Sequence, residues 1–356
     1  MNKAMKKIAT SLNSLMIPLV ALFLLLLFNL FRDINFFRIT VDANGILSGN
    51  LISIINSASE LAIIGMGMTL VTASCGGQDI SVGTVSAIAG AMFAKMLLKT
   101  FTVITIPTIL VSVLVAILVT ILFKLFNGVL VAVFRIQPMI ATLILYSCGR
   151  SIASWIIVDA TTKIEDPLVR YIGMTIPGSP IPTPIYITIV MGLLLLLIFK
   201  LTNLSLYTQA VGINQGAARL NGINPVVVKL LCFVVLGICV TLASVIQVGR
   251  IGSLTQNTIL ADIEMDAILA VAIGGNSLGG GKFRISGTVL GAYVIETLMT
   301  TLRVMNVDTS SIKTYKALAI IAVVVAGSPV IKAGATNLWK KIRTLAHIGT
   351  PKEVIR

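Results

Sequence analysis

The chain has 356 residues, of which 56% are hydrophobic and 11% are charged, and its mean hydropathy is +1.01. Soluble domains contain roughly 45 to 50% apolar residues, so water is not the main solvent of this protein. The net charge of +14 would suit a nucleic-acid partner, but no basic stripe is interleaved with aromatic residues. The composition therefore excludes a soluble nucleic-acid-binding domain and predicts an all-α, polytopic transmembrane helical bundle.

A membrane β-barrel and a cysteine-based scaffold are also excluded. Strands of a barrel alternate apolar and polar residues, whereas Leu22 to Leu27 and Leu193 to Ile198 are continuous aliphatic runs. The cysteines lie in or beside apolar blocks without CxxC spacing, so neither a disulfide framework nor a zinc site is predicted; they are Cys75, Cys148, Cys232 and Cys239.

About ten spans are predicted from apolar blocks of about 20 residues, the length that crosses a bilayer as a helix. The first block follows a short basic stretch, but it is longer than a signal-peptide core and no A-x-A-like site follows it, so we expect a retained span. The predicted spans are 15–31, 56–74, 80–98, 102–123, 138–158, 185–200, 226–247, 265–275, 287–304 and 315–331.

The distribution of charge predicts the orientation in the membrane. If the N-terminus is cytoplasmic, the inside segments hold 16 basic residues, Lys124 and Lys229 among them, against only Asp79 and Glu353. This asymmetry is typical of cytoplasmic loops. It predicts an inner-membrane protein with a cytoplasmic N-terminal segment, 1–14, and a basic cytoplasmic tail, 332–356.

Two predicted spans are irregular. The block 265–275 is too short to cross, and Arg135, Gln137 and Pro138 interrupt apolar sequence between residues 127 and 148. Transporters use broken helices of this kind near their substrates. A faint echo between ISVGTV (80–85) and ISGTVLGA (285–292) suits either two inverted-topology halves or shared close packing of small residues.

Three polar islands carry the most specific signal. They are GMTLVTASCGGQDISVGTVSAIAG (67–90), AVGINQGAARLNGINP (210–225) and DIEMDAILAVAIGGNSLGGGKF (262–283). Together they resemble the permease subunits of ribose-type sugar ABC importers, whose patterns run close to GGIDLSVG, AVGxNxxAARxxGI and ELDAIxAVxIGGxSLxGG in that order. Within the family the likeness is greatest to galactofuranose importer permeases, through residues 136–150 and 265–283. Gln78 stands where Ile is usual, and it leaves the identity of the substrate open.

The resemblance implies a dimeric pore that moves a simple sugar. It implies a second permease copy or a homologous permease, a periplasmic or lipoprotein sugar-binding protein and two cytoplasmic ATP-binding subunits as partners. The segment GGNSLGGGKF departs from a phosphate loop, which would need Gly at Asn276 and Ser or Thr at Phe283. We therefore expect no cofactor in this chain, and ATP and Mg²⁺ to be used by a partner.

Candidate pathway residues are polar groups within apolar sequence. An ionised carboxylate at membrane depth costs roughly 2.5 to 3.5 kcal/mol, so Asp79 needs protein or water beside it; as a helix cap it would touch sugar only indirectly. Arg150 either lines the pathway or snorkels to the interface. Amides offer the donors and acceptors that sugar hydroxyls require, but they also bind freed backbone at helix breaks. The full set is Glu60, Asp79, Asn127, Gln137, Arg150, Asn276 and Glu296.

The island 210–225 predicts a coupling segment. Its alanines favour a short helix, Gly222 is placed to stop that helix, and Pro225 begins the next one. A polar helix of this length suits docking of a cytoplasmic ATPase, whereas a plain connecting loop needs only about 2 to 8 residues. The residues expected to contact the partner are Asn214, Ala217, Ala218, Arg219 and Gly222.

Covalent chemistry within the chain is not predicted. His347 is the only histidine and has no catalytic or metal-binding partner near it in the sequence. The interpretation is a sugar importer permease, with two alternatives left open: a nucleoside importer permease, and an ion-coupled secondary transporter, which would also contain broken helices and buried acids.

Overall fold

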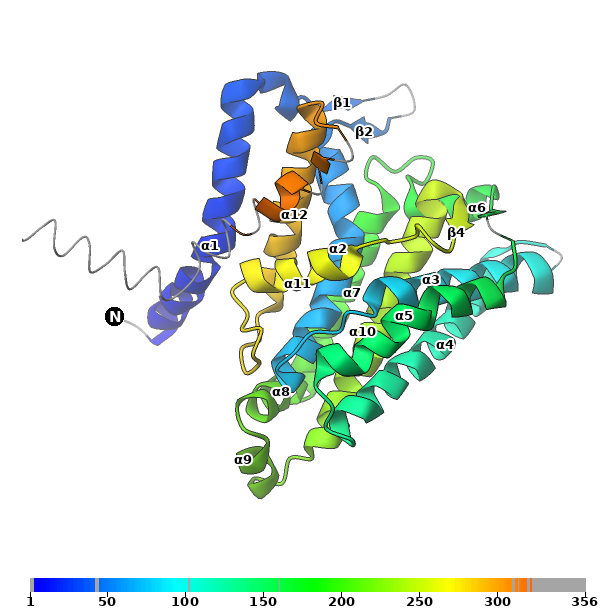
Figure 1. Cartoon of the computed structure of the whole chain (residues 1–356). Coiled ribbons are helices and arrows are strands. Elements are labelled where there is room, and N and C mark those ends of the chain that lie inside the picture. Colours follow the sequence, from blue (N-terminus) through cyan, green and yellow to red (C-terminus); the bar gives the residue numbers. More distant parts are fainter. Residues whose placement is uncertain are drawn as a thin grey trace, which may run out of the picture. The chain divides into compact units, whose positions relative to one another are not determined.

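The computed structural model describes residues 3–41, 45–101, 103–159, 161–308, 311–312, 314–318 and 321. Helices make up most of this part of the chain, and its few strands have two or three residues each (Figure 1), which confirms the all-α prediction. There are two compact units, Met1–Met305 and Asn306–Arg356, and residues 311–312 and 314–318 of the second are helical. The predicted span 315–331 lies largely outside the described residues, and the tail 332–356 lies wholly outside them.

The first unit contains a succession of long helices joined by short turns. In chain order the elements are α1 (Lys3–Arg32), η1 (Ile34–Phe37), β1 (Thr40–Val41), β2 (Leu47–Ser48), α2 (Asn50–Cys75), α3 (Val82–Lys95), η2 (Met96–Thr100), α4 (Ile106–Ala132), α5 (Pro138–Ile156), β3 (Thr161–Lys163), α6 (Pro167–Gly173), α7 (Thr183–Leu201), α8 (Leu204–Ile213), α9 (Gln215–Leu220), α10 (Pro225–Ile251), β4 (Ser253–Thr255), α11 (Ile263–Ile273) and α12 (Ile285–Val304).

Seven helical segments in the described part of the chain are long and apolar enough to cross a membrane: α2, α3 with η2, α4, α5, α7, α10 and α12. The apolar part of α1, Pro18–Arg32, is shorter. Helix α11 has only 11 residues, so it enters the bundle without crossing it, as the short block 265–275 predicted.

Three of the charges counted in the inside segments prove to be buried, which corrects the charge count. The predicted span 102–123 stops before Lys124, but α4 continues to Ala132, and Lys124 is completely buried inside it. Lys229 is likewise inside α10 and only 5% exposed. Asp79, counted as an inside-loop acid, is also fully buried. All three therefore leave the topology argument.

The core is built around the crossing of α2 and α10, which run in opposite directions (Figure 1). The helices that follow α2 and α10 pack in corresponding ways. Helix α4 packs on α10, and α12 packs on α2. Helix α3 contacts both α10 and α4, just as α11 contacts both α2 and α12. Both central helices end at a left-handed glycine, Gly76 and Gly252, with φ of 64° and 71°. This is the arrangement of two inverted repeats, α2–α4 and α10–α12.

The sequence echo does not follow this correspondence. It pairs the start of α3 with the start of α12, whereas the packing pairs α3 with α11. Close packing accounts for it instead: a Cβ on Gly287 would collide with Gly274, and one on Gly83 would collide with the carboxylate of Glu264. The glycines let the elements approach.

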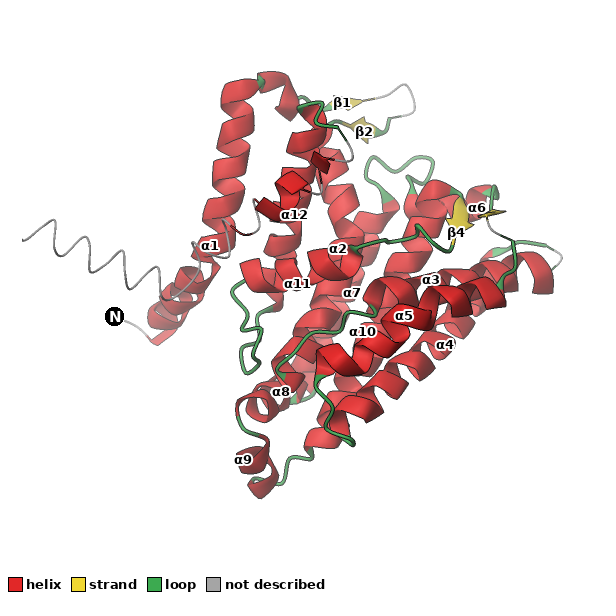
Figure 2. Ribbon diagram, in the orientation of Figure 1, coloured by secondary structure: helices red, strands yellow, loops and turns green. Residues whose placement is uncertain are grey.

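Two small antiparallel sheets join the helices outside the core (Figure 2). Strand β1 pairs with β2 next to the start of α2. Strand β3 pairs with β4, which directly follows α10, so the connection after α5 is held to the end of a central helix.

Candidate functional site

A network of buried polar side chains joins α3 to α4. The ammonium of Lys124 lies 2.8 Å from the Asp79 carboxylate, and both side chains are completely buried. Lys124 also donates to Ser81 Oγ at 3.1 Å, and Asn127 donates to the same hydroxyl at 2.9 Å. Lys124 and Asn127 are three residues apart and so share one face of α4. Lys124 and Asn127 belong to α4, which is long and apolar enough to cross a membrane, and an unpaired charge in such a helix is costly.

The turn before α3 explains how Asp79 reaches this position. Helix α2 ends at Gly76, and Asp79 folds back so that its Oδ1 accepts from the Ser81 backbone N–H at 2.8 Å and from the Ser81 hydroxyl at 2.6 Å. An acid that binds backbone N–H groups at a helix start also opposes the positive end of the helix dipole. Asp79 is thus both the cap of this turn and the counter-ion of Lys124.

The first turns of the two short helices α3 and α11 meet beside this network. A Cβ on Gly83 would lie 2.9 Å from Leu260 O and would collide with the Glu264 carboxylate. Glu264 is 3% exposed, and its Oε2 accepts no hydrogen bond from the described residues. Glu264 of α11 therefore places a second carboxylate beside the start of α3. This carboxylate is within electrostatic range of Lys124 and Arg150.

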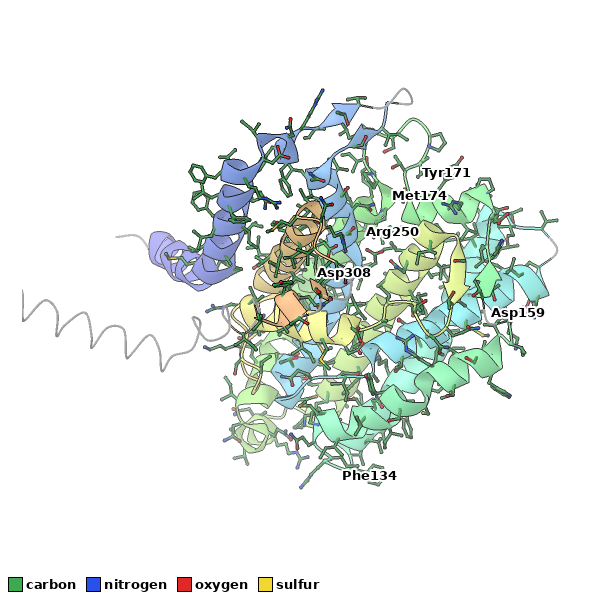
Figure 3. The ribbon with its side chains drawn as sticks, turned by 45° about the horizontal axis from the view of Figure 1, so that its top comes forward. Phe134, Asp159, Tyr171, Met174, Arg250 and Asp308 are labelled. Atoms are coloured by element: carbon green, nitrogen blue, oxygen red, sulfur yellow. The ribbon has the colours of Figure 1, made fainter. Side chains whose placement is uncertain are left out.

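A second ion pair, formed by a buried acid and a half-buried base, joins the two central helices. Arg250 of α10 (labelled in Figure 3) lies 3.1 Å from the Glu60 carboxylate of α2 and donates to Asn56 O at 2.7 Å. Glu60 is 2% exposed. Glu296 of α12 acts electrostatically on Glu60 and lies 3.6 Å from Arg303. Two of the predicted pathway acids, Glu60 and Glu296, therefore belong to one charged region at the junction of α2, α10 and α12.

The other predicted pathway residues are dispersed. Arg150 donates to the carbonyls of Gln256 and Ile259, at 2.5 and 3.4 Å, in the connection between α10 and α11. Asn276 accepts from Arg284 N at 2.7 Å and donates to Thr288 Oγ1 at 2.9 Å, so it spans the break before α12. Gln137 is exposed at the start of α5.

The predicted coupling segment 210–225 comprises the end of α8, all of α9 and the turn that leads into α10. The Asn214 side chain accepts from Ala217 N at 3.0 Å and starts α9, and Gly222 follows α9 with φ of 77°. Ala217 and Arg219 are exposed, whereas Ala218 is buried. Figure 1 shows α9 projecting from the same end of the unit as α8.

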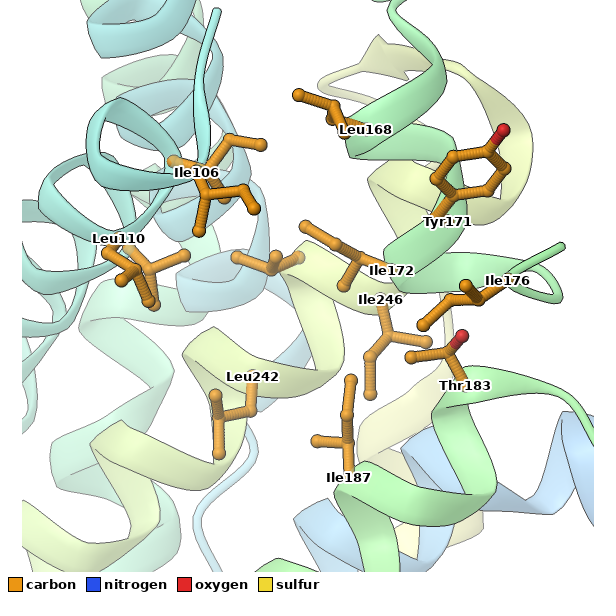
Figure 4. A pocket seen from close by; sticks show the side chains of 13 residues that line it. Ile106, Leu110, Leu168, Tyr171, Ile172, Ile176, Thr183, Ile187, Leu242 and Ile246 are labelled. Atoms are coloured by element: carbon orange, nitrogen blue, oxygen red, sulfur yellow. The ribbon is translucent and has the colours of Figure 1, made fainter. Parts of the chain in front are cut away.

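An apolar cavity of about 450 Å³ separates α6 from the start of α4 (Figure 4). Its lining is aliphatic apart from two side chains that bear a hydroxyl, Tyr171 and Thr183, and it contains no amide, carboxylate or basic group. Sugar hydroxyls require several hydrogen-bonding partners, so this cavity is unsuited to a sugar.

Sequence reasoning missed Lys124, Ser81, Arg250 and Glu264 as site residues. The available signal was a lysine followed three residues later by Asn127 in a block that is otherwise apolar. Because the predicted span 102–123 ends before Lys124, the prediction treated this lysine as a loop residue and missed its place in α4. Among the described residues, no group of three or more His, Cys, Asp or Glu side chains is arranged to hold a metal ion.

Comparisons with known proteins assign the family. Residues 50–329 match the family described as branched-chain amino acid transport system / permease component. The chain is 36% identical to the galactofuranose transporter permease protein of Escherichia coli K12 over 87% of this chain and 88% of that protein. It is 31% identical to the fructose import permease protein of Bifidobacterium longum NCC 2705 over 96% of this chain and 94% of that protein.

A third relative is the ribose import permease protein of Escherichia coli K12, 32% identical over 80% of this chain and 87% of that protein. No solved structure matches the chain. The seven described helical segments that are long and apolar enough to cross a membrane fit a membrane permease. The chain therefore belongs to the permease-component family that contains these importer permeases.

Proposed function

We propose that the chain is the transmembrane permease subunit of an ATP-driven importer, and that it moves a simple sugar inward by alternating access. The observation that carries the proposal is similarity over most of the chain to permeases named for galactofuranose, fructose and ribose. The matching family's description refers to branched-chain amino acids. We choose sugars because these three relatives, matched over 80 to 96% of this chain at 31 to 36% identity, are named as sugar permeases.

The energy source in this proposal is a separate cytoplasmic ATPase that uses ATP and Mg²⁺. The chain itself is a transport subunit and not an enzyme. Support comes from α9, where Leu220 is 91% exposed and the preceding Ile213 is 75% exposed. Apolar side chains on a polar, projecting segment suit a protein partner better than water. A sugar-binding protein on the outer side and a second permease complete the proposed assembly.

The proposed pathway residues differ in access. Gln137 is exposed and Arg150 and Glu296 are half-buried, so their side chains are accessible at the surface of the bundle. Asp79 and Asn127 are enclosed, and Glu60 and Asn276 are nearly so. We therefore assign direct sugar contact to Gln137, Arg150 and Glu296, and to the four enclosed residues only the role of holding helices and turns together.

The proposed orientation has both termini in the cytoplasm, which leads to a labelling experiment. In a background without the native cysteines, Asn214→Cys is expected to react with an impermeant thiol reagent only from the cytoplasmic side. Lys163→Cys should react only from outside; it is preferable to the neighbouring Thr162, which is 6% exposed. Reaction of both positions from the opposite sides would reverse the orientation.

The substrate class is tested by competition. We would reconstitute the permease with its ATPase and binding protein in proteoliposomes and measure uptake of labelled galactofuranose, ribose and fructose. At least one of these sugars should be taken up, and an excess of a nucleoside or of leucine should not compete. Uptake of nucleoside or leucine without sugar uptake would refute the sugar assignment.

A further inference from the structure

Lys124 is an unusual residue in a membrane-spanning helix, and the proposed sugar pathway does not require it. Its side chain is completely buried in α4, where it pairs with an equally buried Asp79. A buried ion pair is weak evidence for stability, because apolar residues of similar volume often stabilise a fold as well or better. The pair therefore calls for an explanation in terms of what it holds in place.

The network holds the turn between α2 and α3 against α4. Ser81 is its centre: its hydroxyl donates to Asp79 and accepts from both Lys124 and Asn127. These bonds connect two residues of the turn with two residues on one face of α4. The turn cannot leave α4 without separating two charges where water is excluded, and this makes the connection stiff.

The beginning of the same turn, at Gly76, contacts the loop 274–284, and this loop in turn contacts α8, which leads into the coupling segment 210–225. A Cβ on Gly76 would lie 2.9 Å from Gly279 O, so the turn packs directly on the backbone of the loop 274–284. A Cβ on Gly212, near the end of α8, would lie 2.7 Å from Gly281 N and would collide with Ala73 O. Gly281 N also donates to Ala73 O at 3.0 Å.

These contacts form a continuous connection. Backbone contacts link α8 with the last turn of α2 and the loop 274–284. From there the chain runs through residues 76–81, and the side chains of Asp79 and Ser81 complete the connection to Lys124 in α4. Small residues allow the three backbones to touch, so little side-chain freedom is available to absorb a displacement of α8.

We propose that Lys124, acting through Asp79 and Ser81, is a positioning residue for energy coupling: it makes α4 follow the turn 76–81 when α8 and α9 are displaced by the ATPase. The inference rests on the proposed function. Without the network, the glycine-containing turn would bend, and ATP would be hydrolysed without a matching movement of α4.

The test removes both charges together, so that neither is left unpaired. The full complex carrying Asp79→Asn and Lys124→Met is reconstituted, and sugar uptake and ATP hydrolysis are measured in the same proteoliposomes. The expected result is ATP hydrolysis near the unaltered level with at least a tenfold fall in sugar moved per ATP. Thr120→Val is the matched control, because Thr120 is buried one turn earlier in α4 and, among the described residues, its hydroxyl donates only to Ala116 O of the same helix, 2.8 Å away.

The outcomes separate this inference from its alternatives. A purely structural role would lower the amount of assembled complex and leave sugar moved per ATP unchanged, and that result overturns the proposal. If the double variant does not fold, Ser81→Ala together with Asn127→Ala removes the bonds of α4 to the Ser81 hydroxyl without altering charge, and an unchanged ratio there overturns the coupling role of Ser81. Absence of ATP-driven uptake in the unaltered complex would instead refute the proposed function itself.

Discussion

Replacing Lys124 alone by methionine is expected to prevent accumulation of most of the folded permease. The substitution leaves the Asp79 carboxylate completely buried without its counter-ion. Removing one partner of a buried pair costs about 3 to 5 kcal/mol, which is a large part of a total stability of about 5 to 15 kcal/mol. The measurement is the yield of monodisperse permease after detergent extraction, together with its thermal midpoint.

The double change Asp79→Asn with Lys124→Met is the informative comparison. It removes the stranded charge, so most of the yield lost in the single variant should return, even though two side chains now differ. The pair would be irrelevant to stability if the single variant matched the unaltered protein in yield and thermal midpoint. Thr120→Val should remain close to the unaltered protein in both.

Enlarging the exposed face of α9 is expected to disconnect the permease from its ATPase. Ala217 is exposed, whereas Ala218 is 4% exposed and its backbone N–H donates to Asn214 O at 3.0 Å. The two alanines are therefore not equivalent. Ala217→Trp alters only a surface that a partner would touch, while Ala218→Trp would also disturb the packing of α9 itself.

We expect Ala217→Trp to lower sugar-stimulated ATP hydrolysis and sugar uptake by at least about tenfold, equivalent to ~1.4 kcal/mol of docking energy. Leu193→Trp serves as the control, because Leu193 is 61% exposed on α7, well separated in sequence from α9. Both activities are compared at equal amounts of membrane-inserted protein. Normal coupling in Ala217→Trp and in Ala218→Trp would exclude α9 as the docking element.

The fold class could be predicted because hydropathy is local. Most of the long helices could be located from continuous apolar blocks. Gly76 and Pro225 are turn signals that can be read directly in the sequence. The boundary of α4 could not be placed correctly, because a lysine ends an apolar block by composition, whereas its buried partner Asp79 lies 45 residues earlier in the chain.

The site was predicted less completely for the same physical reason. Polar residues in apolar sequence identified Asp79, Asn127, Glu60 and Glu296, but not which of them meet. Their partners come from other helices: Lys124 from α4, and Arg250 from the last turn of α10, which lay beyond the predicted end of that span at 247. The inverted repeat is visible in the matched packing of α2–α4 and α10–α12, while the short echo between residues 80–85 and 285–292 pairs the wrong helices.

The dependence of uptake on ATP is the most direct test of the central claim, that this chain is a permease driven by a separate ATPase. Proteoliposomes would contain the complete complex, binding protein and labelled sugar outside, and either ATP with Mg²⁺ or ADP inside. The account predicts accumulation of sugar only with ATP, undiminished when ionophores dissipate proton and sodium gradients. Accumulation by the permease alone, without ATPase or ATP and abolished by the ionophores, would contradict it.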